Sequence, residues 1–300
     1  MKIRSATLVS AGVLFLAACG SAAASELITQ DASIYSASCT TGTTAAFPGG
    51  FRADRSCNNR AVSGVASSVS DALNNAQLFG NLGAAGGRYC NLPINGMQSF
   101  PGGYVANFSC GVATLGGVGS TATDTGVNAL AFANLENQTG LRCRVPLANV
   151  SAFAGGYIVN AACGNWTISG VGNTAKEAGV NALGFATVHA LGGRRCTATL
   201  SDIDGYIGGA LVTFRCNGAR TVSGVGSNVA DAAANALDFA SYEAAVGRDC
   251  STQRSEVGFG QGGYQIRFNC RGGYVTGAGL TATQAGADAL AKAEARWPSN

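Results

Sequence analysis

The sequence predicts an α+β protein, a tandem array of five small β-β-β-α repeats with an antiparallel sheet, one helix and one disulfide in each. Three observations predict this fold. Ten of the 11 cysteines fall into five pairs, two glycines recur before the second cysteine of each pair, and an alanine-rich run follows it. Self-similarity at a fixed period of this size is typical of repeat architectures.

The cysteines mark the period of the repeat. Paired cysteines lie 18 residues apart in the first repeat and 20 apart in the others, and second cysteines recur every 53 or 54 residues. An even count in an exported chain indicates disulfides, whereas a metal site would need close C-x-x-C spacing and histidine partners. We therefore expect five bridges and no metal or cofactor. The pairs are Cys39–Cys57, Cys90–Cys110, Cys143–Cys163, Cys196–Cys216 and Cys250–Cys270.

Each second cysteine ends a stretch that alternates like a half-buried strand. Tyr264, Ile266 and Phe268 share one face, and polar residues separate them. The segment after the first cysteine is less regular, although Cys90 and Ile94 are in phase. A hairpin turning at 99–102 would place the two cysteines of repeat 2 opposite each other, and a short third strand such as 166–169 follows.

A helix closes each repeat. A residue that caps helices stands three positions before an acidic or amide residue, which is the capping-box pattern. The five capping residues are Ser68, Thr121, Thr174, Asn228 and Thr281. The apolar face of the third helix is wider than one small sheet needs, because Val180 lies on its far side. We expect neighbouring repeats to touch through their helices. The recurring helix amides Asn75, Asn128, Asn181 and Asn235 are expected to bond to backbone in the adjacent hairpin, with ligand recognition as the alternative.

The repeats divide the chain into units of about 50 residues, a size at which a single core is marginal. A disulfide that closes such a loop contributes roughly 3 kcal/mol in the chain-entropy model, so we expect folding to depend on the bridges. The expected boundaries are 36–86, 87–139, 140–192, 193–246 and 247–300, after a signal peptide at 1–18 and a tether at 19–35.

The N-terminus has the features of an export signal. Lys2 and Arg4 precede an apolar run that is too short for a stable membrane span. The run ends in Leu16-Ala17-Ala18-Cys19, which resembles the lipobox of bacterial lipoproteins. This resemblance implies lipidation of Cys19 and, because glycine follows, sorting to the outer membrane. Cleavage after 22–24 would instead release a secreted or periplasmic chain.

The charge disfavours nucleic acid as a partner. The formal net charge is +3, only 12% of residues are charged, and lysine occurs at three positions. A nearly neutral chain lacks the basic surface that nucleic acid or an anionic membrane attracts.

The stretch SGVGNTAKEAG at 169–179 raises the possibility of a phosphate-binding loop. A P-loop needs lysine directly before the hydroxyl residue, but Lys176 follows Thr174. The stretch also recurs without lysine in other repeats, which favours a structural turn with a helix cap. Hairpin, third strand and helix together resemble the C-terminal half of double-stranded RNA-binding domains over about 35 residues. Only Lys176 matches their lysine cluster, so we carry over no function.

Three tyrosines and three arginines are candidate ligand contacts. Tyr104, Tyr157 and Tyr264 follow the glycine pair, and Arg88, Arg194 and Arg248 stand two residues before a first cysteine. The tyrosines are core residues or, if exposed, a regularly spaced sugar-binding row. The arginines form salt bridges or carbonyl contacts at repeat junctions, or a ladder for an anionic glycan. His189, the single histidine, is expected on the surface.

Repetition without a unique polar constellation disfavours an enzyme, because catalysis normally needs one asymmetric site. The sequence therefore predicts an exported envelope repeat protein that is structural or self-associates through helix faces. The alternative is a multivalent module that binds a polysaccharide or an envelope protein, gaining avidity from its repeats.

Overall fold

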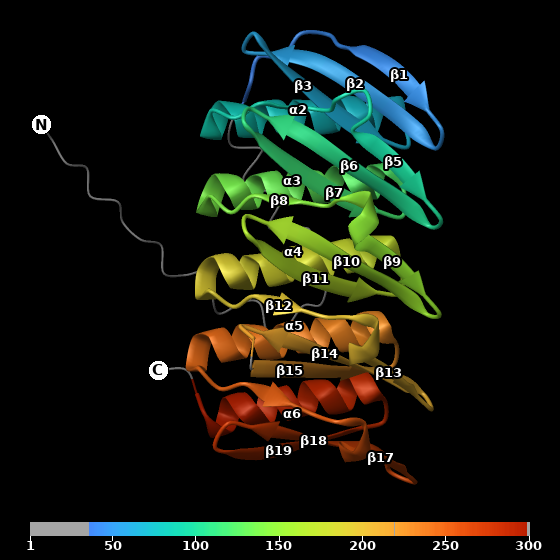
Figure 1. The fold of residues 1–300 in the computed structure, drawn as a ribbon, viewed down its shortest axis with the longest axis vertical. Helices are drawn as coiled ribbons and strands as arrows, with labels where there is room; N and C mark the ends of the chain where they lie inside the picture. The colour runs from blue at the N-terminus through green and yellow to red at the C-terminus, as the bar shows by residue number, and fades with distance from the viewer. Residues whose placement is uncertain (1–35, 219, 299–300) are drawn as a thin grey trace, which may run out of the picture.

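The computed structural model describes residues 36–218 and 220–298. It shows five consecutive repeats, each with a small antiparallel sheet and one helix, which confirms the predicted fold class. Figure 1 shows the repeats following one another along the long axis of the molecule, from blue to red. The expected signal peptide, Cys19 and the tether lie outside the described residues.

The elements repeat in a constant order. Repeat 1 contains β1 (Thr43–Phe47), β2 (Gly50–Cys57), β3 (Arg60–Ala66) and α2 (Val69–Gly86). Repeat 2 contains β4 (Cys90–Asn91), β5 (Met97–Phe100), β6 (Gly103–Cys110), β7 (Ala113–Gly119) and α3 (Ala122–Thr139). Repeat 3 contains β8 (Cys143–Arg144), the 3₁₀ turn η1 (Leu147–Asn149), β9 (Val150–Phe153), β10 (Gly156–Cys163), β11 (Trp166–Gly172) and α4 (Ala175–Gly192).

Repeats 4 and 5 follow the same order. Repeat 4 contains β12 (Cys196–Thr197), η2 (Leu200–Asp202), β13 (Ile203–Tyr206), β14 (Gly209–Cys216), β15 (Arg220–Gly226) and α5 (Val229–Val246). Repeat 5 contains β16 (Cys250–Ser251), η3 (Arg254–Glu256), β17 (Val257–Gly260), β18 (Gly263–Cys270), β19 (Gly273–Gly279) and α6 (Ala282–Arg296). The eight-residue strand is central in every sheet.

The first strand of repeats 2–5 is broken in two, which the sequence analysis did not predict. In repeat 2, Cys90 pairs with Cys110 and Met97 pairs with Ala106. The first strand advances seven residues between these two pairs and the central strand only four, so three residues of the first strand loop out. In repeat 1 a single extra residue is accommodated, which explains the shorter cysteine spacing. The hairpin turn therefore shifts past the midpoint of the cysteines, to residues 101–102, and Ile94 in the loop is 93% exposed.

Each helix begins at the predicted cap. The side chains of Ser68, Thr121, Thr174, Asn228 and Thr281 each accept a hydrogen bond from the backbone N–H three residues later. Complete capping boxes form in α4 and α6. The first four helices end at a glycine in the left-handed conformation, where a side chain would be strained.

Consecutive repeats pack against each other, and their buried residues form clusters that extend across the repeat boundaries. Each helix packs on the third strand of its own repeat, on the neighbouring helix and, in repeats 2–5, on the third strand of the preceding repeat. Phenylalanine rings join the repeats, because a helix ring packs on a strand ring of the next repeat: Phe79 on Phe108, Phe185 on Phe214 and Phe239 on Phe268. The expectation that repeats touch through helices is thus confirmed.

The last sheet differs from the others on its outer face. In repeats 2–4 this face carries buried aliphatic residues such as Val105 and Val225. In repeat 5 the equivalent positions hold Gln265 and Ala278, both exposed, and no further helix covers them within the described residues. A polar outer face on the terminal unit is typical of capped repeat arrays.

Candidate binding surface

The five predicted disulfides form as expected. In each repeat the bridge joins cysteines that face each other across the sheet, with Cα–Cα distances of 4.0 or 4.1 Å. Nine of these ten cysteines are buried and Cys39 is partly buried, so the bridges have the surroundings of structural disulfides and not of a reactive site.

The three candidate tyrosines lie at repeat boundaries. The hydroxyl of Tyr157 donates to the carbonyl of Pro101, and that of Tyr264 to the carbonyl of Ile207, at 3.2 and 3.1 Å. The Tyr104 ring lies against the preceding hairpin turn, where a Cβ on Gly49 would stand 1.7 Å from its hydroxyl. Each tyrosine therefore fixes one hairpin tip against the next repeat.

A second aromatic residue lies at each of these hairpin tips. The last residue of the first hairpin strand is Phe47, Phe100, Phe153 or Tyr206 in repeats 1–4, and each ring is only partly buried. Phe47 packs against Tyr104, Phe100 against Tyr157 and Tyr206 against Tyr264, with ring centroids 6.1–6.3 Å apart. We call Phe47, Phe100, Phe153 and Tyr206 the aromatic row. Burial raises the pKa of Tyr206 to about 12, so its phenol stays neutral.

The candidate arginines contact protein groups at the repeat junctions. Arg88 and Arg142 both pair with Glu136, a buried residue at the end of α3. Arg194 and Arg220 pair in the same way with the fully buried Glu243. Arg248 donates to the carbonyl of Arg271. These partners explain why arginine recurs before the first cysteine without invoking a ligand.

The helix amides bond to backbone, as expected, although the partner is the third strand of the repeat and not the hairpin before it. Asn75, Asn128, Asn181 and Asn235 each bond to the backbone of a valine ten residues earlier, on the third strand of the same repeat. Asp288 makes the equivalent bond in repeat 5. These side chains tie the helix to the sheet.

The glycine-rich stretch before α4 has a packing role. A Cβ on Gly170 or Gly172 would come within 2.1 or 2.5 Å of the α4 backbone, so only glycine allows the helix to approach this closely. Lys176 pairs with Asp124 of the preceding repeat. His189, expected on the surface, is partly buried near the end of α4, and its pKa is lowered chiefly by burial.

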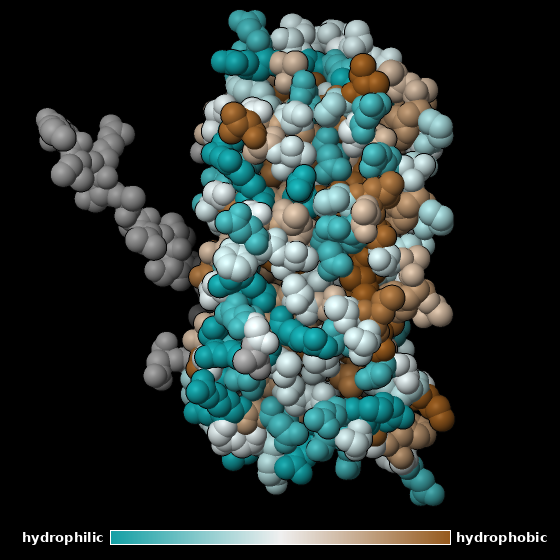
Figure 2. Space-filling view, in the orientation of Figure 1, coloured by the Kyte–Doolittle hydropathy of each residue, from teal (hydrophilic) through white to brown (hydrophobic). Residues whose placement is uncertain are grey.

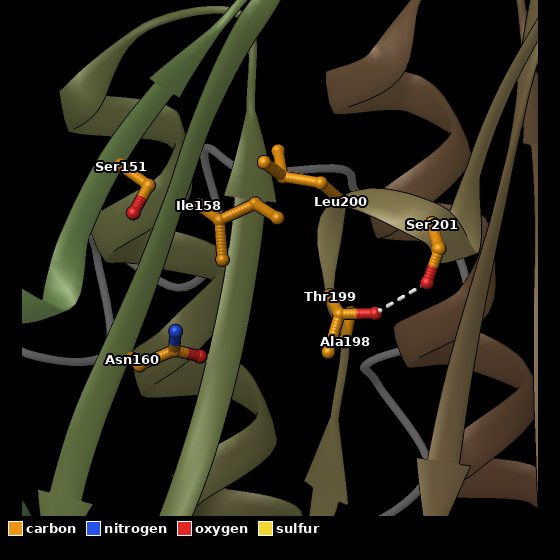
Figure 3. Close-up of a pocket in the computed structure, with 7 residues that line it drawn as sticks. All are labelled: Ser151, Ile158, Asn160, Ala198, Thr199, Leu200 and Ser201. Carbon is orange, nitrogen blue, oxygen red and sulfur yellow. Dashed lines mark hydrogen bonds between the residues drawn. The ribbon is translucent and has the colours of Figure 1, made fainter.

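Two hollows lie at the boundary between repeats 3 and 4, and sequence reasoning found neither. The first is lined by Ser151, Ile158, Asn160, Ala198, Thr199, Leu200 and Ser201. Figure 3 shows Ile158 of β10 on one side of this groove and Leu200 of η2 on the other, while the Thr199 hydroxyl points toward Ser201. Ile158 and Leu200 form its apolar part, while the hydroxyls of Thr199 and Ser201 bond to each other at 2.9 Å.

The second hollow is more polar and more cationic. It is lined by Trp166, Thr167, Arg195, Thr197, Arg215, Asn217 and Gly218. No group of His, Cys, Asp or Glu within residues 36–218 and 220–298 is arranged to hold a metal ion.

The sequence matches no known protein family, and no curated protein matches it. No helix of the described part of the chain is long and apolar enough to cross a membrane. The assignment of function therefore rests on the surface itself.

Proposed function

We propose that this protein is a non-enzymatic, exported repeat module of the bacterial envelope that binds an elongated polysaccharide along its repeats. Five disulfides indicate a compartment outside the reducing cytoplasm. The lipobox-like motif at 16–19 supports anchoring through Cys19 in the outer membrane.

The aromatic row carries this proposal. Four aromatic side chains occupy equivalent positions at the hairpin ends of repeats 1–4, and all four remain partly exposed. Aromatic rings combine a large apolar surface with a rigid shape, which suits contact with the C–H faces of sugars. A chain of sugars that touches several equivalent positions at once gains avidity without requiring a strong single contact.

Self-association through helix faces, the first expectation from the sequence, loses the feature that suggested it. The wide apolar helix faces pack against the neighbouring helix and the preceding sheet inside the same chain. Because the outer face of the last sheet is polar, it also lacks the aliphatic contacts that hold successive repeats together.

One observation still favours a structural, self-associating role as a second candidate. Ile94, Leu200 and Ile207 are large aliphatic residues with more than half of their surface exposed. Figure 2 shows hydrophobic residues gathered in a vertical band on the side of the molecule where Figure 1 labels β5, β9 and β13. Exposed apolar surface of this kind is often an interaction site.

Two measurements on the oxidised mature chain separate these candidates. Co-sedimentation with peptidoglycan, alginate and dextran tests polysaccharide binding, and light scattering over a concentration series tests self-association. We expect a monomer that binds at least one polymer, with affinity that rises with polymer length and falls when Phe100, Phe153 and Tyr206 are all replaced by leucine.

The control replaces Val112, which is 97% exposed on another turn, with serine. Equal loss in this control would show that the aromatic row is not the contact. Growth into oligomers without polysaccharide binding would overturn the proposal in favour of the second candidate.

A further inference from the structure

The cationic hollow between repeats 3 and 4 combines residues from two repeats. Trp166 and Thr167 come from β11, while Arg195, Thr197, Arg215 and Asn217 come from the cysteine strands of repeat 4 and their flanks. No carboxylate lines the hollow, although two guanidinium groups do. We call it the Trp166 hollow.

Arg195 is held in the hollow by an aromatic ring. Its guanidinium carbon lies 3.5 Å from the centroid of the Trp166 ring, and Trp166 is 46% exposed. A guanidinium that stacks on a ring keeps its N–H groups at the edge of the plane, free to bind a carboxylate in a two-point geometry. Among the ion pairs of the described residues, none involves Arg195.

The backbone around Arg195 is also fixed. The Asn217 side-chain oxygen accepts a bond from the N–H of Arg195 at 3.0 Å, and the N–H of Asn217 donates to the carbonyl of Arg195 at 2.9 Å. Both residues are direct neighbours of the Cys196–Cys216 bridge. A group positioned before the ligand arrives loses less conformational entropy on binding.

Arg215 supplies the second cation. It lies opposite Thr197 in the sheet, and one of its terminal nitrogens pairs with Asp202 at 2.8 Å. Its side chain is still 57% exposed, so other N–H groups face the solvent. Thr167, Thr197 and the Asn217 amide add neutral hydrogen-bonding groups beside the two cations.

The charge of Arg195 acts on its surroundings. It lowers the pKa of His189, although burial is the larger cause of that shift. A nearby cation disfavours a second positive charge and favours an anion, so the same field would favour a bound carboxylate.

The hollow does not recur along the array. The position of Trp166 is occupied by Arg60, Ala113, Arg220 and Gly273 in the other repeats. Repetition of the fold therefore does not account for an exposed tryptophan beside two arginines, which distinguishes this junction from the four-membered aromatic row.

We propose that the Trp166 hollow binds the carboxylate of an acidic sugar unit, of the uronic acid type. Arg195 and Arg215 bind the carboxylate, Thr167, Thr197 and Asn217 bond to sugar hydroxyls, and the exposed surface of Trp166 packs on the ring carbons. This inference rests on the proposed polysaccharide function and names the chemical class of one unit of that polymer.

Tryptophan fluorescence tests this assignment directly, because the chain has only two tryptophans, Trp166 and Trp297. In a Trp297→Phe background, emission comes from Trp166 alone. Titration with sodium glucuronate at constant ionic strength should give a saturable change, whereas glucose should give none. Loss of a hydrogen-bonded charge should weaken binding by about tenfold or more in Arg195→Gln and in Arg215→Gln.

Arg144→Gln is the matched control. Arg144 is exposed and occupies the position of Thr197 one repeat earlier. Its substitution removes the same positive charge from the chain, and glucuronate binding should not change. Arg215 is exposed, so its variant remains decisive if Arg195→Gln fails to fold.

Three outcomes would overturn the inference: no response to glucuronate at tens of millimolar, equal weakening in the control, or phosphate binding as tightly as glucuronate. If alginate still co-sediments with the array while Trp166 does not respond, the Trp166 hollow is wrong and the proposed function stands. If neither alginate, peptidoglycan nor dextran binds and glucuronate also fails, both fall.

Discussion

The hydroxyl of Tyr157 donates a hydrogen bond to the carbonyl of Pro101, 3.2 Å away and one repeat earlier in the chain. This bond ties the start of one central strand to the hairpin tip of the preceding repeat. The equivalent bond from Tyr264 to Ile207 ties repeat 5 to repeat 4. Neighbouring repeats are thus held together at their hairpin tips as well as through their helices.

Replacing Tyr157 with phenylalanine should lower the free energy of unfolding by about 0.5–1.5 kcal/mol, because one hydrogen bond is lost and the ring remains. Chemical denaturation measures the change. Tyr104→Phe is the control, since within residues 36–218 and 220–298 the Tyr104 hydroxyl makes no hydrogen bond and the ring contacts Phe47. An equal loss in both variants would mean that the hydroxyl bond contributes nothing specific.

Replacing Asn181 with alanine should cost about 1–3 kcal/mol, because it leaves the Val171 carbonyl without its buried donor. Asp288→Ala removes the equivalent bond in repeat 5, where the side chain is only partly buried, and should cost less. Denaturation midpoints of the two variants test the order. The reverse order would show that burial does not set the strength of this bond.

Replacing Glu243 with glutamine should be among the most destabilising single changes, at about 3–5 kcal/mol, since it removes the buried negative charge that Arg194 and Arg220 share. Lys176→Ala breaks the exposed pair with Asp124 and should cost at most about 1 kcal/mol. Thermal unfolding of both variants compares the two pairs. Similar costs would contradict the importance of the buried junction.

The ionisation of Asp202 should make the free energy of unfolding depend on pH in the acidic range. Burial alone would raise its pKa, but hydrogen bonds from Thr199 and Arg215 outweigh that effect and lower the pKa below its ordinary value of 3.8. A carboxylate with a lowered pKa contributes stability above pH 3.8 and loses it as the pH falls through the folded-state pKa. The wild type should therefore exceed Asp202→Asn in stability by a constant amount at pH 5–8, and the difference should shrink below about pH 4.

Asp204→Asn, at an exposed position on β13, is the control for this pH series. The pH series of Asp202→Asn is read against the series of this variant. A difference between wild type and Asp202→Asn that persists unchanged to pH 2 would contradict the assigned shift.

Loss of the bridge in repeat 3 by Cys143→Ala with Cys163→Ala should cost roughly 3 kcal/mol in the chain-entropy model. Reduction of all five bridges should abolish folding, because each repeat is too small for a self-sufficient core. Far-UV circular dichroism before and after reduction measures the outcome. An unchanged spectrum in the fully reduced chain would show that the bridges are dispensable.

Sequence reasoning located the repeats, the bridges and the helix caps, but it misplaced the hairpin. The equal spacing of Cys90 and Cys110 about position 100 indicated a symmetrical hairpin, whereas the structure loops three residues out of one side. The cysteine spacing gives only the total number of residues between the two cysteines. It does not show how many of them lie in the turn and how many loop out of the first strand. The broken first strand is a consequence of that division.

The sequence by itself determined the features that depend on residues close together in the chain. Thr174 caps α4 because Glu177 follows three residues later, and a cross-strand bridge needs only a hairpin between its cysteines. The tertiary structure decided what happens between repeats: that Arg194 and Arg220 converge on Glu243, and that Trp166 meets Arg195 across a junction. Such contacts depend on how one repeat is rotated and shifted against the next, which is set by the packing of whole helices and sheets and not by local spacing.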